Sequence, residues 1–401
     1  MRRATASTVI SSCRFAYPDE RSVPHALGKR AVRVTSVSAR AFRCFDEVTI
    51  EPAPDGLTVL YGRNGSGKTS LVEAISFVAT GASFRGSTRD SMIRTGEEGA
   101  RVEARLALGE RRAQVDAVIT CGRPTAFFVN GRRERTSEAI ADVLRVTTFS
   151  AADLDIVQGG PGNRRDVLDA LLGSIYPRMG GVIAEVDRAL RQRGALLKQL
   201  AGGARTEDLA TLDVWDDRLA RSGTTLSSAR EELCERLEPI VRGRYNALSG
   251  SRAMRVGIDY RRSWEGDLSS ALGKSRDSDL FRQVTSQGPH RDEVELTLDG
   301  RPARTEASRG EQRCLAISLR LASHELLAED HPGDPPVLLL DDVFSELDEG
   351  RARALLGQLP EGQTILTTSS SPPPGASVAR IVSFDAATGY SAVAQSSESH
   401  Q

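Results

Sequence analysis

Between residues 31 and 151, apolar residues alternate with polar ones or form short apolar runs bounded by turn residues. Such a pattern predicts β-strands. The predicted strands are 31–37, 47–51, 57–61, 100–108, 114–120 and 126–129. Asn130-Gly131 after the last strand is a pair that favours a hairpin turn of a primed type. One stretch with helical spacing, 70–78, interrupts the strands, so this region is predicted to be a mixed α/β lobe.

The pattern changes to a helical period between residues 164 and 248. Apolar positions form one helical stripe from Pro177 to Leu200, and after Gly202-Gly203 they return at steps of three, four and seven residues. This predicts an antiparallel helical hairpin whose second helix would be ~60 Å long if unbroken, although Gly223 is expected to interrupt it. An ordinary pair of core helices would give the same pattern, and that alternative stays open.

The last part of the chain returns to strands that alternate with helices. Strands are predicted at 293–298, 337–341, 364–368 and 378–384, and helices at 310–328 and 346–356. Val337–Asp341 is apolar up to its last residue, as in strands buried inside a parallel sheet. The predicted division is a basic tail at 1–30, a head lobe at 31–160, an arm at 161–285, the rest of the head at 286–386, and a disordered tail at 387–401.

Residues 62–69 fit the phosphate-binding pattern G-x-x-x-x-G-K-[ST] and lie between a predicted strand and a predicted helix. Its glycines permit positive φ and close backbone approach, while the helix N-terminus favours anions. The chain has only four lysines, and Lys68 is placed where an ammonium reaches phosphate. The predicted nucleotide-binding residues are Gly62, Arg63, Asn64, Gly65, Ser66, Gly67, Lys68, Thr69 and Ser70.

Asp341 and Asp342 follow the apolar residues of strand 337–341, where ligands bind in open α/β sheets. Asp341 is expected to hold Mg²⁺ opposite Thr69. Asp342 is the candidate catalytic base, or the group that orients the attacking water, and Lys68 assists at the phosphates. A pair of aspartates alone is weak evidence, but its combination with a phosphate-binding loop predicts one ATP site with Mg²⁺.

Ser308-Arg309-Gly310-Glu311 precedes an amphipathic helix. It resembles the signature motif of ABC-type ATPases, in which Ser and Gly contact the γ-phosphate of a nucleotide on the opposite subunit. By itself, S-x-G-E is only a helix cap. Its position ahead of the Asp341 strand makes Ser308 and Gly310 candidate catalytic residues acting on a second copy. The predicted fold class is therefore α/β: an ABC-type P-loop ATPase head, with a mixed sheet lobe and a parallel core, and an inserted short antiparallel helical or coiled-coil arm.

Composition limits the alternatives. The formal net charge is -1, so nucleic-acid binding requires local basic patches or surfaces formed on association. The five cysteines contain no C-x-x-C pair, which argues against a zinc site or a disulfide framework and favours a reducing cytoplasm. No apolar run approaches the ~20 residues that span a bilayer. The basic first residues lack the apolar stretch of a secretory signal, and a disordered tail or an upstream start codon is preferred to a transit peptide.

Beyond these motifs, the chain resembles the RecF family of bacterial recombination-mediator ATPases, within the SMC and ABC-ATPase superfamily. The resemblance extends from about Val32 to Phe384. It rests on the segments 41–45 (AFRCF), 82–86 (ASFRG), 149–154 (FSAADL), 157–169 (VQGGPGNRRDVLD) and 287–292 (QGPHRD). The last two are the most distinctive, because neither is found in transporter subunits.

The resemblance implies a cytoplasmic bacterial protein that forms an ATP-dependent homodimer and binds single-stranded and gapped duplex DNA. It implies a weak, DNA-stimulated ATPase that cooperates with RecR and RecO, loads RecA and supports the SOS response. Basic residues that could pair with DNA phosphates are Arg132, Arg133, Arg164 and Arg165. Each cluster could equally be a solvated charged face.

Departures from fast ABC ATPases lead us to expect slow hydrolysis. Asp342 is one methylene shorter than the usual Glu, Arg309 replaces a Gly, and Thr367 and Thr368 stand where a sensor His would be. A transporter subunit would have the Glu, the Gly and the sensor His at these positions, and it would have no long helical insertion. An SMC clamp would need a longer arm, and its zinc-hook relative would need cysteines at the arm tip. A DNA-binding module that is not gated by ATP remains an alternative, which a Lys68→Ala variant would test.

Overall fold

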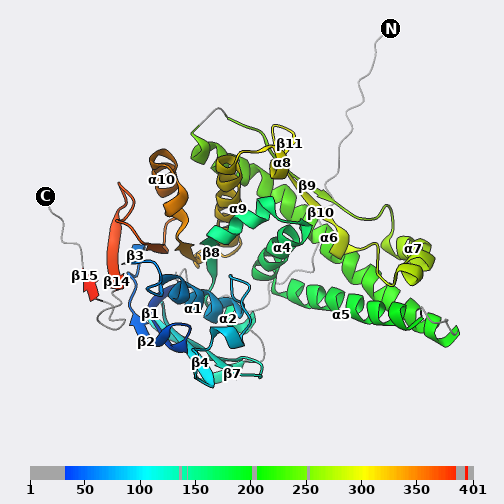
Figure 1. Cartoon of the computed structure of the whole chain (residues 1–401), viewed down its shortest axis with the longest axis horizontal. Helices are drawn as coiled ribbons and strands as arrows, with labels where there is room; N and C mark the ends of the chain where they lie inside the picture. The colour runs from blue at the N-terminus through cyan, green and yellow to red at the C-terminus, as the bar shows by residue number, and fades with distance from the viewer. Residues whose placement is uncertain are drawn as a thin grey trace, which may run out of the picture.

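The computed structural model describes residues 32–134, 138–141, 143–200, 206–250, 253–384 and 393–395 of the chain (Figure 1). The predicted tail 1–30 and the Gly202-Gly203 break lie outside the described residues. Of the predicted tail 387–401, residues 393–395 form strand β15 (Val393–Gln395), which pairs with β14. Among the described residues, no helix is both long and apolar enough to cross a membrane.

The N-terminal strands form an antiparallel sheet with the order β2-β1-β4-β5-β6-β7. Its members are β1 (Val32–Phe42), β2 (Phe45–Ile50), β4 (Gly99–Leu108), β5 (Arg111–Thr120), β6 (Ala126–Val129) and β7 (Arg132–Glu134). Asn130 and Gly131, with φ of 49° and 76°, close the turn between β6 and β7. Positive φ at both positions is what the primed turn requires, so the predicted hairpin is confirmed.

The core sheet has the order β15-β14-β3-β13-β12-β8, and its strands are parallel except for the β14–β15 pair. It contains β3 (Gly56–Gly62), β8 (Val146–Ser150), β12 (Val337–Asp341), β13 (Gln363–Thr368) and β14 (Val378–Phe384). Strand β3 therefore lies between two strands from the other end of the chain. The prediction that both ends of the chain build one head is confirmed.

The two faces of the core sheet pack into different cores. Along β12, Leu338 and Leu340 belong to one hydrophobic cluster, whereas Val337 and Leu339 belong to the other. Helix α1 (Lys68–Thr80) and the antiparallel sheet cover the second face, while α9 (Arg309–Asp330) and α10 (Glu349–Leu356) cover the first. Successive side chains of β12 thus point to opposite faces of the sheet, and α1 and α9 pack on these different faces.

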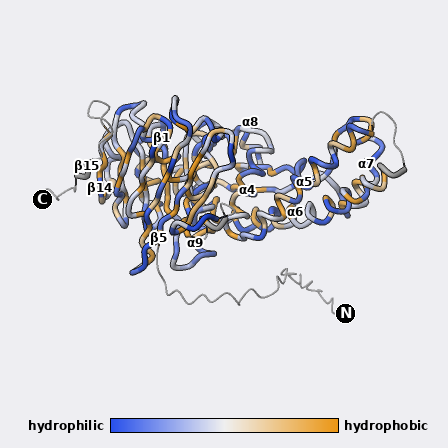
Figure 2. Tube along the Cα trace, turned by 90° about the horizontal axis from the view of Figure 1, so that it is seen from below, coloured by the Kyte–Doolittle hydropathy of each residue, from blue (hydrophilic) through white to orange (hydrophobic). Residues whose placement is uncertain are grey.

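The helical insertion projects from the head as a hairpin of α5 (Pro177–Leu200) and α6 (Thr206–Ser249), with α7 (Leu268–Arg282) beside it (Figures 1 and 2). The predicted hairpin is confirmed, but the interruption at Gly223 is wrong. Helix α6 runs through this position for 44 residues in all. A Cβ on Gly223 would lie 2.9 Å from Leu268 and 3.0 Å from Pro289, so the glycine permits close packing.

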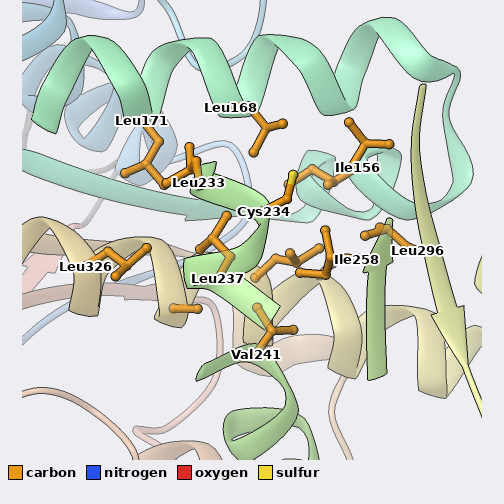
Figure 3. Packing of buried hydrophobic residues seen from close by; sticks show 14 of the residues in the cluster. Ile156, Leu168, Leu171, Leu233, Cys234, Leu237, Val241, Ile258, Leu296 and Leu326 are labelled. Carbon is orange, nitrogen blue, oxygen red and sulfur yellow. The ribbon is translucent and has the colours of Figure 1, made fainter. Parts of the chain in front are cut away.

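The base of the arm is joined to the head by a shared apolar core (Figure 3). It unites α4 (Pro161–Ile175), α6 and α9 with β9 (Val256–Arg261) and β10 (Glu293–Leu298), which pair in a small sheet with β11 (Arg301–Pro302). Strand β9 was not predicted, although it lies within the range assigned to the arm. Leu168, Leu233, Leu237, Ile258, Leu296 and Leu326 meet in this core.

The remaining elements are short. They are η1 (Asp90–Met92), α2 (Glu138–Ala141), η2 (Ala151–Asp153), α3 (Leu154–Gln158), η3 (Pro289–Arg291), α8 (Ala303–Glu306) and η4 (Val343–Glu346). The helix predicted at 346–356 begins later than expected, because Asp348 is its N-cap and accepts a hydrogen bond from the Arg351 N–H. An Asp side chain that caps a helix sets the start of that helix.

Candidate functional site

The phosphate-binding loop connects β3 to α1. Gly67 has a φ of 97°, which only glycine adopts readily. The Lys68 ammonium donates hydrogen bonds to the carbonyl oxygens of Gly62 at 2.6 Å and Arg63 at 2.8 Å. The Ser66 hydroxyl is buried and has no hydrogen-bond partner within the described protein. An ammonium group, an unpaired hydroxyl and a helix N-terminus together suit the phosphates of a nucleotide. Asn64, Gly65, Thr69 and Ser70 complete the predicted loop and the first turn of α1.

A buried ion pair between Arg43 and Glu73 lies at helix α1, which follows the loop. Glu73, on α1, is fully buried and accepts hydrogen bonds from the Arg43 guanidinium at 2.8 and 2.6 Å and from the Ser83 hydroxyl at 2.5 Å. A Cβ on Gly67 would lie 2.5 Å from the Phe45 ring. The segments 41–45 and 82–86 thus meet at the P-loop helix. Glu73 was missed, because a single acid in a helical stretch resembles a surface residue.

The candidate Mg²⁺ ligands lie together. The Thr69 hydroxyl donates to Oδ1 of Asp341 at 2.9 Å, and the Thr367 hydroxyl donates to the same oxygen at 2.8 Å. Burial raises the pKa of Asp341, and these two hydrogen bonds oppose the increase. A hydroxyl and a carboxylate at this spacing suit Mg²⁺, which prefers oxygen ligands. Thr367 was noted only as a replacement for a sensor His, but it is the register partner of Asp341 in β13.

Asp342 follows Asp341 in an unusual backbone conformation. Its φ of 54° lies in the left-handed region, where a non-glycine residue is strained. The Asp342 N–H donates to the Thr367 hydroxyl at 2.9 Å, and the Ser345 hydroxyl donates to the Asp342 carbonyl at 2.9 Å. Burial lowers the pKa of Lys68, while the charges of Asp342 and Asp341 raise it. The exposed Asp342 carboxylate and the Lys68 ammonium therefore influence each other electrostatically.

Ser308 is the N-cap of α9 and is exposed. Its hydroxyl accepts a hydrogen bond from the Glu311 N–H at 3.3 Å, and the Glu311 carboxylate accepts from the Ser308 N–H and hydroxyl at 2.7 Å each. These bonds lower the pKa of Glu311. Helices α9 and α1 pack against opposite faces of the core sheet, and the hydrogen bonds of Ser308 join it to Glu311 and not to the phosphate-binding loop.

The four candidate DNA contacts differ in accessibility. Arg132 and Arg133 are exposed on β7, at the edge of the antiparallel sheet. Arg164 is only 7% exposed, pairs with Glu293 at 2.9 Å and donates to two backbone carbonyls. The structure therefore argues against Arg164 as a DNA contact, because its charge is already committed inside the protein. Arg165 is half-buried, donates to the Asp292 carbonyl at 2.6 Å and has a pKa lowered by burial.

A P-loop on a parallel core, aspartates at the neighbouring strand end and an exposed signature-type helix cap define an ABC-type P-loop ATPase head. Residues 33–371 match the family model described as the RecF/RecN/SMC N terminal domain. The DNA replication and repair protein RecF of Acidothermus cellulolyticus is 38% identical over 352 residues, covering 84% of this chain and 94% of that protein. The chain belongs to the RecF family.

Further proteins are similar to this chain in sequence or in structure. The RecF of Frankia alni is 41% identical over 358 residues, covering 84% of this chain and 93% of the relative. A solved structure of the recombination mediator protein RecF with ATP superposes with a TM-score of 0.82 at 26% identity, covering 93% of this chain and all of that chain. An Smc head domain from Pyrococcus furiosus shares the fold, with a TM-score of 0.53 at 16% identity.

Proposed function

We propose that this protein is an ATP-switched, DNA-binding recombination mediator of gap repair and replication in the bacterial cytoplasm. Its relatives bear the names DNA replication and repair protein and recombination mediator protein in the RecFOR pathway. Membership of the family supports RecO and RecR as partners. In this proposal the protein binds single-stranded and gapped duplex DNA, helps to load RecA and thereby supports the SOS response.

The observation that carries this proposal is the separation of two half-sites in one copy. Ser308 and Gly310 lie at the start of α9, where Ser308 is exposed, while Lys68 is the first residue of α1, the helix that packs against the opposite face of the core sheet. Two copies that associate face to face would place Ser308 and Gly310 of one copy beside the terminal phosphate held by Lys68 of the other. ATP would therefore act as the link between subunits.

Within each half-site the residues have distinct roles. Lys68 and the loop N–H groups bind the phosphates, while Thr69 and Asp341 would hold Mg²⁺, which neutralises phosphate charge when it is bound. Asp342 accepts a hydrogen bond from the attacking water. Its short side chain is expected to orient that water poorly, which gives slow hydrolysis. A long-lived ATP state suits a protein that must remain on DNA, and stimulation by DNA would end that state.

The exposed Arg132 and Arg133 are the best candidates for DNA phosphate contacts, and the half-buried Arg165 is a weaker one. With a net charge of -1, a single copy has no overall attraction for DNA. Pairing two copies would let Arg132 and Arg133 of both copies contact one DNA molecule, so local basic patches, and not net charge, would provide the attraction. Binding should therefore be sensitive to salt and should require the ATP-bound dimer.

The test measures molar mass by light scattering with and without Mg-ATP, followed by binding to gapped DNA. Lys68→Ala should abolish ATP binding, and Asp342→Asn should bind ATP and remain dimeric. Ser308→Ala should bind ATP as a monomer but fail to associate. A wild-type protein that stays monomeric in saturating Mg-ATP, or a Ser308→Ala variant with weakened monomer affinity for ATP, would contradict the proposal.

A further inference from the structure

The guanidinium of Arg351, on α10, lies against the backbone of Gly310. A Cβ on Gly310 would be 2.6 Å from Nη1 and 3.1 Å from Nη2 of Arg351, so any other residue here would displace the end of the arginine side chain. The glycine of the signature-type motif therefore makes room for an arginine of its own chain. No sequence pattern connected these two residues.

The electrostatics at this position are unusual. The N-terminus of a helix carries a partial positive charge and favours anions, yet Arg351 places a full positive charge there. Arg351 forms an ion pair with Asp348 at 3.4 Å, and that carboxylate is 62% exposed. The Glu311 carboxylate bonds to Ser308, and the charge of Arg351 contributes to the lowered pKa of Glu311. Arg309 is exposed beside them. Of these two acids, one is exposed and the other bonds to Ser308, so the guanidinium of Arg351 and the exposed Arg309 can both meet an anion with several negative charges.

We propose that Arg351 binds the nucleotide held by the partner copy, and that its guanidinium contacts the phosphate beside Ser308 and Gly310. This inference rests on the proposed face-to-face dimer. In this inference, the group that contacts the partner's nucleotide consists of Ser308, Gly310 and an arginine from α10. The planar guanidinium supplies two parallel N–H donors, a geometry that matches phosphate oxygens and that the Ser308 hydroxyl cannot provide.

The experiment measures two affinities for each variant: ATP binding by the monomer at low protein concentration, and dimer dissociation in saturating Mg-ATP. Arg351→Ala should leave monomer ATP binding unchanged and weaken dimerisation roughly 10- to 100-fold, as expected for lost hydrogen bonds to a charged group. Arg351→Lys keeps the charge without the paired donors, so it should recover part of the loss. Arg353→Ala, at an exposed arginine of the same helix, is the matched control and should behave as wild type.

The outcomes distinguish this inference from the proposed function. If Ser308→Ala prevents association while Arg351→Ala associates normally, the role of Arg351 is refuted and the dimer stands. If wild-type protein does not associate in Mg-ATP, the proposed function itself fails. Equal loss in Arg351→Ala and Arg353→Ala would assign the effect to general surface charge and would also overturn the inference. Thermal unfolding of each variant verifies that it is folded.

Discussion

Thr367→Val should weaken the Mg²⁺-dependent part of ATP binding while leaving the P-loop intact. Thr367 is 1% exposed, and its hydroxyl both donates to Asp341 at 2.8 Å and accepts from the Asp342 N–H at 2.9 Å. Valine has nearly the same shape, so the change removes the hydroxyl with little effect on packing. Asp341 keeps its bond from Thr69 at 2.9 Å, and therefore the loss should be partial.

The magnitude follows from the two hydrogen bonds. A hydrogen bond to a charged group contributes about 1.5–3 kcal/mol, and the Asp342 N–H is left without its partner. At 1.4 kcal/mol for each factor of ten, the affinity for Mg-ATP should fall roughly 10- to 100-fold. The variant also loses the hydrogen bond from the Asp342 N–H to Thr367, which holds the strained backbone at Asp342. Because Asp342 is the residue proposed to orient the attacking water, hydrolysis should also slow.

Titration calorimetry with ATP, in the presence and absence of Mg²⁺, measures the effect. Affinity without Mg²⁺ should match wild type, because Lys68 and the loop are unchanged. Thr364→Val is the matched control, since Thr364 is 3% exposed on the same strand and is the register partner of Leu338. An unchanged Mg²⁺ dependence in Thr367→Val, or an equal loss with and without Mg²⁺, would refute the role assigned to Thr367.

Three further predictions concern stability and are measured by urea unfolding. Arg193→Met should cost about 3–5 kcal/mol, because it leaves the buried Asp279 without its charged partner and leaves Asp216 with Arg276 alone, whereas the exposed Arg191→Met should cost little. Gly223→Ala should destabilise α6 by about 1–3 kcal/mol through overpacking, while Gly243→Ala, with nothing within 4 Å, should stabilise it by about 0.5–1 kcal/mol. Burial, with a smaller effect of the nearby Arg244, lowers the pKa of His324 to about 4, so the folded state resists protonation and its stability falls as pH drops below about 6.5. Wild type should lose about 1 kcal/mol more than His324→Leu between pH 7 and 5.5.

Many of the features predicted correctly from sequence have local causes. Val337–Asp341 and Glu293–Leu298 were placed to the residue, because an apolar run or a regular alternation defines each strand. Asn130-Gly131 was correct, because its turn depends on two adjacent φ angles. The P-loop was predictable because its order of strand, glycines and helix is contiguous in the chain.

The errors come from partners that lie far apart in sequence. Arg164 looked like a surface cation, but Glu293, which pairs with it, is 129 residues away. Gly223 looked like a helix breaker, and only the neighbouring Leu268 and Pro289 explain why the helix needs it. The contact between Arg351 and Gly310 likewise depends on how α10 packs beside α9. Such positions depend on tertiary packing, which local patterns do not encode.

The placement of β3 has a consequence for biosynthesis. Its two neighbours, β13 and β14, are the last strands of the core before β15. During translation, the P-loop strand therefore leaves the ribosome with both edges unpaired and waits for about 300 residues of further synthesis. A nascent or prematurely terminated chain that lacks β13 and β14 cannot complete the nucleotide pocket, so truncated products should expose these strand edges to chaperones and proteases.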